Sequence, residues 1–286
     1  MLGKSLKHEI ISTSRLFIPT YIVMLILALL GRLFTWLETR KAYVNSATDA
    51  SSKMVHSFAN ISMILYMVAL VAIFIMTFLF LIIHFYQDVF TDRGYLTMTL
   101  PVGTNTLVLS RILIAMLWSL LTSVIVIFSA YIIVSQYDEF MSSMKDMFKV
   151  LGDLQDNNPE MIKQSVGVSS VAGYVCELVL YLVLLLTKWY LAFYVSFAFG
   201  QLMMKAHPVG GSILSLVILL TVSKIIESLY KRFIIANPPQ FLENAMVTQG
   251  QVMQYSLIGT MILNVIFGVI FFFLTTGIMK KHLNLD

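Results

Sequence analysis

The chain has 286 residues, of which 58% are hydrophobic and 12% are charged, and its formal net charge is +4. A water-soluble domain needs about 25% charged residues to cover its surface, so this composition excludes an ordinary soluble protein. Apolar runs of about 20 residues, long enough to cross a hydrocarbon core of roughly 30 Å, recur along the chain and predict a polytopic membrane protein. No basic run exceeds two residues, so no nucleic-acid partner is expected.

The first segment, residues 2–15, carries Leu2, Leu6 and Ile10 at helical spacing among charged residues. This spacing predicts an amphipathic helix at the membrane surface. Six apolar runs follow, and the backbone in lipid must satisfy its own hydrogen bonds, so each is expected to be a helix. The predicted fold class is therefore all-α, a single transmembrane domain over 1–286 with spans at about 17–36, 61–83, 108–134, 171–199, 210–230 and 255–279.

Two loops are expected to hold short helices at the outer rim, residues 135–170 and residues 231–254. The first loop has an apolar stripe at helical spacing that we expect to end at Gly152, and Asn158-Pro159-Glu160 begins a further short helix. The second loop repeats the Asn-Pro signal at Asn237-Pro238-Pro239. The stripe consists of Phe140, Met144, Met147, Phe148 and Leu151.

An even number of spans places both ends of the chain on one side of the membrane. With both ends inside, the inner segments and the outer loops carry equal numbers of basic residues, but the inner segments are shorter. Orientation follows basic residues in short segments close to the span ends. We therefore expect a multi-pass protein of a cell membrane with both termini in the cytoplasm.

Four ionisable residues fall inside the predicted spans: Glu177, Lys188, Lys224 and Glu227. Such residues are costly in lipid and usually face the inside of the helix bundle. Lys224 and Glu227 are neighbours at i,i+3. Glu177 and Lys224 lie equally far from the outer ends of their spans, which predicts an ion pair that joins these helices. Lys188 has no evident partner in the sequence and is a candidate residue of a translocation path. A substrate or proton route is the alternative interpretation of these groups.

Few groups suited to catalysis are present. Gly3-Lys4-Ser5 resembles the end of a phosphate-binding loop, but the upstream glycine and strand that such a loop needs are missing. Cys176 is the only cysteine, which excludes an intramolecular disulfide and a cysteine metal cluster. His84, Asp88 and Asp92 share a helix face, but the polar exit of a span explains them better than a metal site. No enzyme activity and no cofactor of its own are therefore expected.

The most patterned polar stretch, residues 86–111, separates the second and third spans and reads YQDVFTDRGYLTMTLPVGTNTLVLSR. Its segment 92–102, followed by LVLSRIL, resembles the loop of ABC-2-type exporter permeases. Bacterial members of that family often carry a GYLTLTLPV segment there, with a basic residue at the start of the third span. The six spans, the helical outer segments and the short basic tail agree with that architecture.

The resemblance implies that this loop, residues 86–106, forms a coupling helix that docks on ATP-binding-cassette ATPase subunits made as separate chains. Those subunits would bind ATP and Mg, and a second permease, identical or paralogous, would complete the translocation path. Apolar residues beside charged ones in so short a loop also favour a partner surface, although a loop folded on its own bundle would look the same. The candidate coupling residues are Asp88, Asp92, Arg93, Tyr95, Leu96, Met98, Leu100 and Pro101.

The predicted function is thus the permease subunit of an ATP-driven exporter, with a peptide, a drug or a lipid-like amphiphile as substrate. An ATP-independent channel or secondary transporter is one alternative, and a membrane sensor or scaffold is another. Secondary transporters are favoured by broken helices and paired ion sites within the membrane. The spans of this chain contain few internal breaks.

Overall fold

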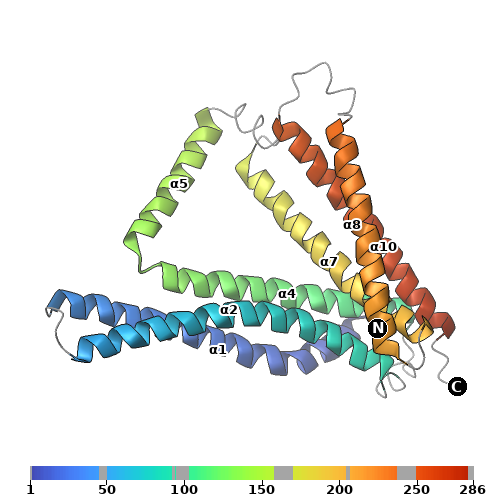
Figure 1. The fold of residues 1–286 in the computed structure, drawn as a ribbon, viewed down its shortest axis with the longest axis horizontal. Coiled ribbons are helices and arrows are strands. Elements are labelled where there is room, and N and C mark those ends of the chain that lie inside the picture. Colours follow the sequence, from blue (N-terminus) through green and yellow to red (C-terminus); the bar gives the residue numbers. More distant parts are fainter. Residues whose placement is uncertain are drawn as a thin grey trace. The chain divides into compact units, whose positions relative to one another are not determined.

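The computed structural model describes residues 2–44, 50–91, 94, 103–157, 170–203, 207–236 and 249–282 (Figure 1). These residues form helices and short connections and contain no β-strand. The helices are α1 (Leu2–Val44), α2 (Ala50–Phe90), α4 (Thr104–Val134), α5 (Asp138–Asn157), α7 (Val171–Met203), α8 (Pro208–Ala236) and α10 (Gln249–His282).

All of these helices except α5 are long and apolar enough to cross a membrane, which supports a multi-pass membrane protein and confirms the all-helical class. Each of the six predicted spans falls within one of them. Only 22% to 50% of the most apolar stretch of each helix is buried within the chain. Large apolar side chains such as Ile127 and Phe273 therefore point outward, as expected of surfaces that face lipid.

The predicted N-terminal helix is not a separate element, because α1 runs without a break through residues 2–15 and the first predicted span. Pro19 lies inside this helix and removes one backbone donor. No glycine or polar turn separates the two ranges, so nothing in the sequence stops the helix between them. Thr13, which falls in the segment expected at the membrane surface, is fully buried.

Helix α5 contains the apolar stripe predicted in the loop 135–170. It continues past Gly152 to Asn157, so the predicted end at the glycine is wrong. A glycine within a helix lowers its stability by only about 1 kcal/mol, which the surrounding turns can outweigh. The two Asn-Pro signals, at Asn158-Pro159 and at Asn237-Pro238, lie outside the described residues.

The chain divides into two compact units. Unit 1 contains Gly3–Ile83 and Leu113–Asp146, and unit 2 contains His84–Ile112 and Met147–Asp286. Helices α2, α4 and α5 each contribute to both units. Unit 1 therefore consists mainly of α1, most of α2 and most of α4, whereas unit 2 combines α7, α8 and α10 with the ends of α2 and α4 that flank the loop 91–103.

Neutral polar and aromatic side chains join the helices of unit 1. The indole of Trp118 on α4 donates to the Thr13 hydroxyl at 2.7 Å, and its ring stacks on Phe17 at a centroid distance of 4.6 Å. The Tyr21 hydroxyl lies 2.8 Å from the Thr122 hydroxyl, which lies 3.1 Å from that of Thr77 on α2. These contacts bring α1, α2 and α4 together at one level.

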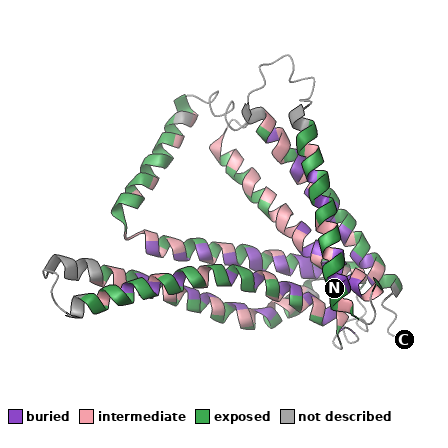
Figure 2. Cartoon of the chain, viewed as in Figure 1, coloured by how far each residue is buried: buried purple, intermediate pink, exposed green. Residues whose placement is uncertain are grey.

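In unit 2, α7 packs against both α8 and α10. Its buried residues lie in its C-terminal half, from Lys188 to Gly200 (Figure 2). Helices α7 and α8 approach closely near the start of α8, where a β-carbon at Gly200 would overlap Ser212 and lie 2.6 Å from the Pro208 carbonyl oxygen. Only glycine fits there, so this residue fixes how α7 and α8 pair.

Candidate functional site

Two polar clusters stand out in unit 2, one beside the loop 91–103 and one deeper in α7 and α8. Most of the predicted coupling residues, namely Asp92, Arg93, Tyr95, Leu96, Met98, Leu100 and Pro101, lie outside the described residues. Backbone hydrogen bonds hold both described ends of the loop. The Gly94 amide donates to the Thr91 carbonyl at 2.7 Å, and Gly103 accepts from the first turn of α4.

The chain turns sharply after α2. A β-carbon at Gly94 would overlap the Val89 carbonyl oxygen and lie 2.9 Å from its carbon, so the backbone folds directly against the last turn of α2. Helix α2 ends at Phe90 and α4 begins at Thr104, which leaves a short connection between two long helices.

A buried ion pair joins the two helices at the base of this loop. Arg111 on α4 places Nη1 2.7 Å from Oδ2 of Asp88 on α2, and both side chains are about nine-tenths buried. His84 lies one turn before Asp88, with Nε2 3.2 Å from the same carboxylate oxygen and 3.3 Å from Arg111. Of the predicted coupling residues, Asp88 is the one that the structure describes, and its role is to tie α2 to α4.

His84 and Asp88 are also two of the three residues whose sequence spacing could form a metal site. The structure brings His84 and Asp88 together, and it gives the carboxylate a guanidinium partner in Arg111. A guanidinium 2.7 Å from a buried carboxylate stabilises its negative charge through a charge-assisted hydrogen bond. Asp92, the third residue of that interpretation, lies outside the described residues.

Aromatic rings attach the base of the loop to α7. Phe85 of α2 stacks on Tyr194 of α7 with ring centroids 3.6 Å apart, and Tyr86 lies 4.9 Å from Phe197. Phe90, the last residue of α2, also faces Phe197 at 6.5 Å. The end of α2 is thus packed against α7 through aromatic rings.

The second cluster is a network of three charges on α7 and α8. Lys188 of α7, 1% exposed, forms an ion pair with Oε1 of the buried Glu227 on α8. Oε2 of Glu227 lies 3.2 Å from Lys224, one turn earlier on the same helix. The Lys188 ammonium is also 6.0 Å from the centre of the Phe267 ring on α10. Lys188, which has no evident partner in the sequence, therefore has one in the structure.

The predicted ion pair between Glu177 and Lys224 is wrong, because both side chains have other partners. Glu177 accepts a hydrogen bond of 2.5 Å from Gln254 of α10, and Lys224 contacts Glu227. Glu177 lies 26 residues before the end of α7, whereas Lys224 lies 16 residues after the start of α8. In a helical hairpin this difference of ten residues is about 15 Å along the axis.

A further polar side chain lies on α10. Asn264 is 2% exposed and follows the buried face that also carries Phe267 and Phe271. Its Oδ1 atom has no hydrogen-bond partner among the described residues. Helices α7, α8 and α10 therefore bury a cation, an anion and an amide, namely Lys188, Glu227 and Asn264.

Comparisons of the chain with protein-family models, with curated proteins and with solved structures found no match. A functional proposal therefore rests on the ion pairs of unit 2 and on the sequence pattern of residues 92–102.

Proposed function

We propose that this chain is the permease subunit of an ATP-binding-cassette exporter of the ABC-2 type, driven by separate ATPase subunits through the loop after α2. The observation that carries the proposal is the buried Asp88–Arg111 ion pair at the base of that loop. The segment that resembles the family's coupling loop sits between two long helices tied at that point. ATP and Mg would be bound by the partner subunits.

In this proposal each remaining element lies on a particular side of the membrane. The expected coupling loop, of which residues 86–90 belong to α2 and residues 104–106 to α4, lies in the cytoplasm together with both chain termini. Helix α5 then lies on the outer side, where its exposed apolar residues such as Phe148 rest at the membrane rim. A second copy of the chain, or a paralogue, forms the other half of the path. The substrate is a peptide, a drug or a lipid-like amphiphile, and Lys188 of α7 borders its route.

The first test is co-purification with an ATPase subunit encoded beside this chain. We expect Leu96→Arg and charge reversal at Asp92 or Arg93 to weaken that association and to lower transport, while the permease still inserts in the membrane. Normal recovery of the complex and normal transport-coupled ATPase activity from all three variants would contradict the proposal.

The loop base gives a second test with a matched control. We expect Asp88→Asn and Arg111→Gln to retain ATPase binding but to lower transport-coupled ATPase activity, because α2 and α4 would no longer move together. The two changes should be non-additive, since each removes the same ion pair. Asp146→Asn, at an exposed position of α5, serves as the control and should leave the coupled activity unchanged.

A secondary transporter is the second candidate, and the buried Lys188–Glu227 pair favours it. Paired charges inside a membrane bundle often mark ion or proton routes. The two candidates differ in their source of energy. Transport by the purified chain alone in liposomes under a proton gradient would favour the second candidate, whereas transport that requires the ATPase subunits and ATP would favour the exporter.

A further inference from the structure

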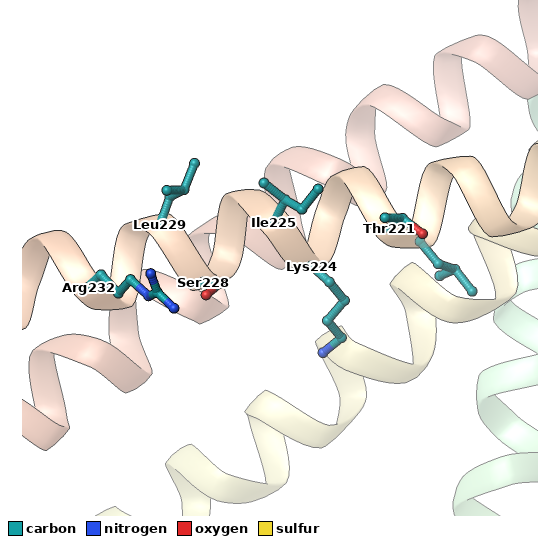
Figure 3. Close-up of a pocket in the computed structure, with 7 residues that line it drawn as sticks. Thr221, Lys224, Ile225, Ser228, Leu229 and Arg232 are labelled. Atoms are coloured by element: carbon teal, nitrogen blue, oxygen red, sulfur yellow. The ribbon is translucent and has the colours of Figure 1, made fainter.

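The outward side of α8 carries a shallow hollow that the proposed function does not use (Figure 3). Its volume is about 550 Å³, and its residues repeat at the spacing of one helix face. Three of its lining side chains are apolar, two carry hydroxyl groups and two are cationic. The lining residues are Leu220, Thr221, Lys224, Ile225, Ser228, Leu229 and Arg232.

The charges at this hollow do not balance. Glu227 is the acidic group beside it, but that side chain is buried and shares its two oxygens between Lys188 and Lys224. Two ammonium groups on one carboxylate leave a surplus positive charge, and the Lys224 side chain is 62% exposed. Arg232, two turns further along α8, is exposed as well and adds a second positive charge.

The arrangement of the groups suits a headgroup rather than a soluble ion. In Figure 3 the Arg232 guanidinium is turned toward Ser228, so a phosphate between them could accept from both. Lys224 lies eight residues before Arg232, about 12 Å along the helix. In Figure 3 the Lys224 side chain runs toward α7, and its ammonium lies 3.2 Å from Oε2 of Glu227, so its positive charge stays beside the hollow. Ile225 and Leu229, both more than half exposed, continue the surface on which acyl chains would lie.

We propose that this hollow binds an anionic phospholipid of the surrounding bilayer, with the phosphate at Arg232 and Ser228 and the acyl chains along Leu220, Ile225 and Leu229. Lys224 supplies a second positive charge beside the same hollow. The lipid balances the surplus charge that the Lys188–Glu227 pair leaves on Lys224. This inference does not rest on the exporter proposal, because it requires only that α8 spans a membrane.

The test is retention of lipid by the purified full-length chain, measured by native mass spectrometry after exchange into defined mixtures of phosphatidylglycerol and phosphatidylcholine. We expect the wild-type chain to retain phosphatidylglycerol in preference to phosphatidylcholine. Each basic side chain near an anionic surface contributes about a factor of five. The double variant Lys224→Gln/Arg232→Gln should therefore retain phosphatidylglycerol roughly thirtyfold less tightly, and Arg232→Gln alone about fivefold less tightly.

Two controls make the result specific. Lys53→Gln removes an exposed lysine at the start of another span and should retain phosphatidylglycerol as the wild type does. Arg232→Gln changes an exposed residue at the end of its span, so a loss of retention in this variant is not explained by misfolding. Equal retention of the two lipids by the wild type, unchanged retention in the double variant, or an equal loss in Lys53→Gln would each overturn the proposal.

Discussion

The two units hold their membrane helices together with different chemistry. In unit 1, hydroxyl and indole groups join α1, α2 and α4, as in the contacts of Trp118 with Thr13 and of Tyr21 with Thr122. In unit 2, full charges join α7 and α8 through Lys188 and Glu227. Neutral hydrogen bonds between membrane helices contribute about 0.6 kcal/mol on average. A buried charge that loses its partner costs several times more.

The two kinds of contact differ in how much stability is lost when one of them is broken. The loss of one neutral hydrogen bond lowers the stability of the packed helices only slightly. A buried ion pair is poor evidence for stability as such, because apolar residues of similar size are often as stable or more so. The Lys188–Glu227 pair is therefore a candidate for a role beyond stability, and unit 2 also contains Asp88 and Arg111 beside the proposed coupling loop.

The largest expected effect is at Glu227. Because two lysines share this carboxylate, Glu227→Gln leaves Lys188 buried without a counter-charge. We expect the free energy of unfolding in detergent to fall by about 3–5 kcal/mol. Lys188→Met should cost less, because Lys224 still pairs with Glu227.

The double variant Lys188→Met/Glu227→Gln provides the control for that prediction. It removes the pair without leaving a buried charge, so it should recover most of the stability that Glu227→Gln loses. It should still lose transport if the pair serves function. A double variant as unstable as Glu227→Gln, or one with full transport, would break the contrast between the two units.

The sequence predicts the helices better than it predicts their contacts. Apolar runs identify the six membrane helices because length and hydrophobicity act locally. Their pairing depends on register, and the expected Glu177–Lys224 pair does not form because Glu177 lies about ten residues further from the α7–α8 connection than Lys224 does. The sequence pattern also does not predict the Asp88–Arg111 pair, although the segment between these residues is short enough to bring them together.

The hydroxyl contacts of unit 1 could not be predicted for a different reason. Serine and threonine occur throughout the membrane helices and often bond their own backbone, as Thr20 does with the Leu16 carbonyl. The sequence alone does not show which hydroxyl turns outward to a neighbouring helix. The aromatic residues that accompany them, such as Trp118, are also common in lipid-facing positions.

A second prediction compares one glycine in each unit. Gly200→Ala should lower the free energy of unfolding by about 1–3 kcal/mol, because its β-carbon would meet backbone atoms of Pro208 and Ser212 at 2.6 Å. Gly31 on α1 is the matched position in unit 1, where a β-carbon would lie 3.7 Å from Ile133, an ordinary contact. Gly31→Ala should therefore be neutral or stabilising by up to about 1 kcal/mol.

These two variants also test how the charged network depends on the α7–α8 turn. A shift of the hairpin in Gly200→Ala should separate Lys188 from Glu227, so that adding Glu227→Gln to this variant costs less than it does in the wild type. Strict additivity of the two changes would show that the charge pair forms independently of the close approach at Gly200.

The smallest expected effect is in unit 1, at the Tyr21 hydroxyl. Tyr21→Phe removes its hydrogen bond to Thr122 and keeps the ring, so the free energy of unfolding should fall by about 0.6 kcal/mol and by no more than about 1.7 kcal/mol. Tyr131→Phe, at an exposed position of α4, is the control and should have no measurable effect. Transport should be unchanged in both variants, because neither touches the loop base or the buried charges. A loss at Tyr21 as large as that of Glu227→Gln would mean that the neutral network of unit 1 is as critical as the charges of unit 2.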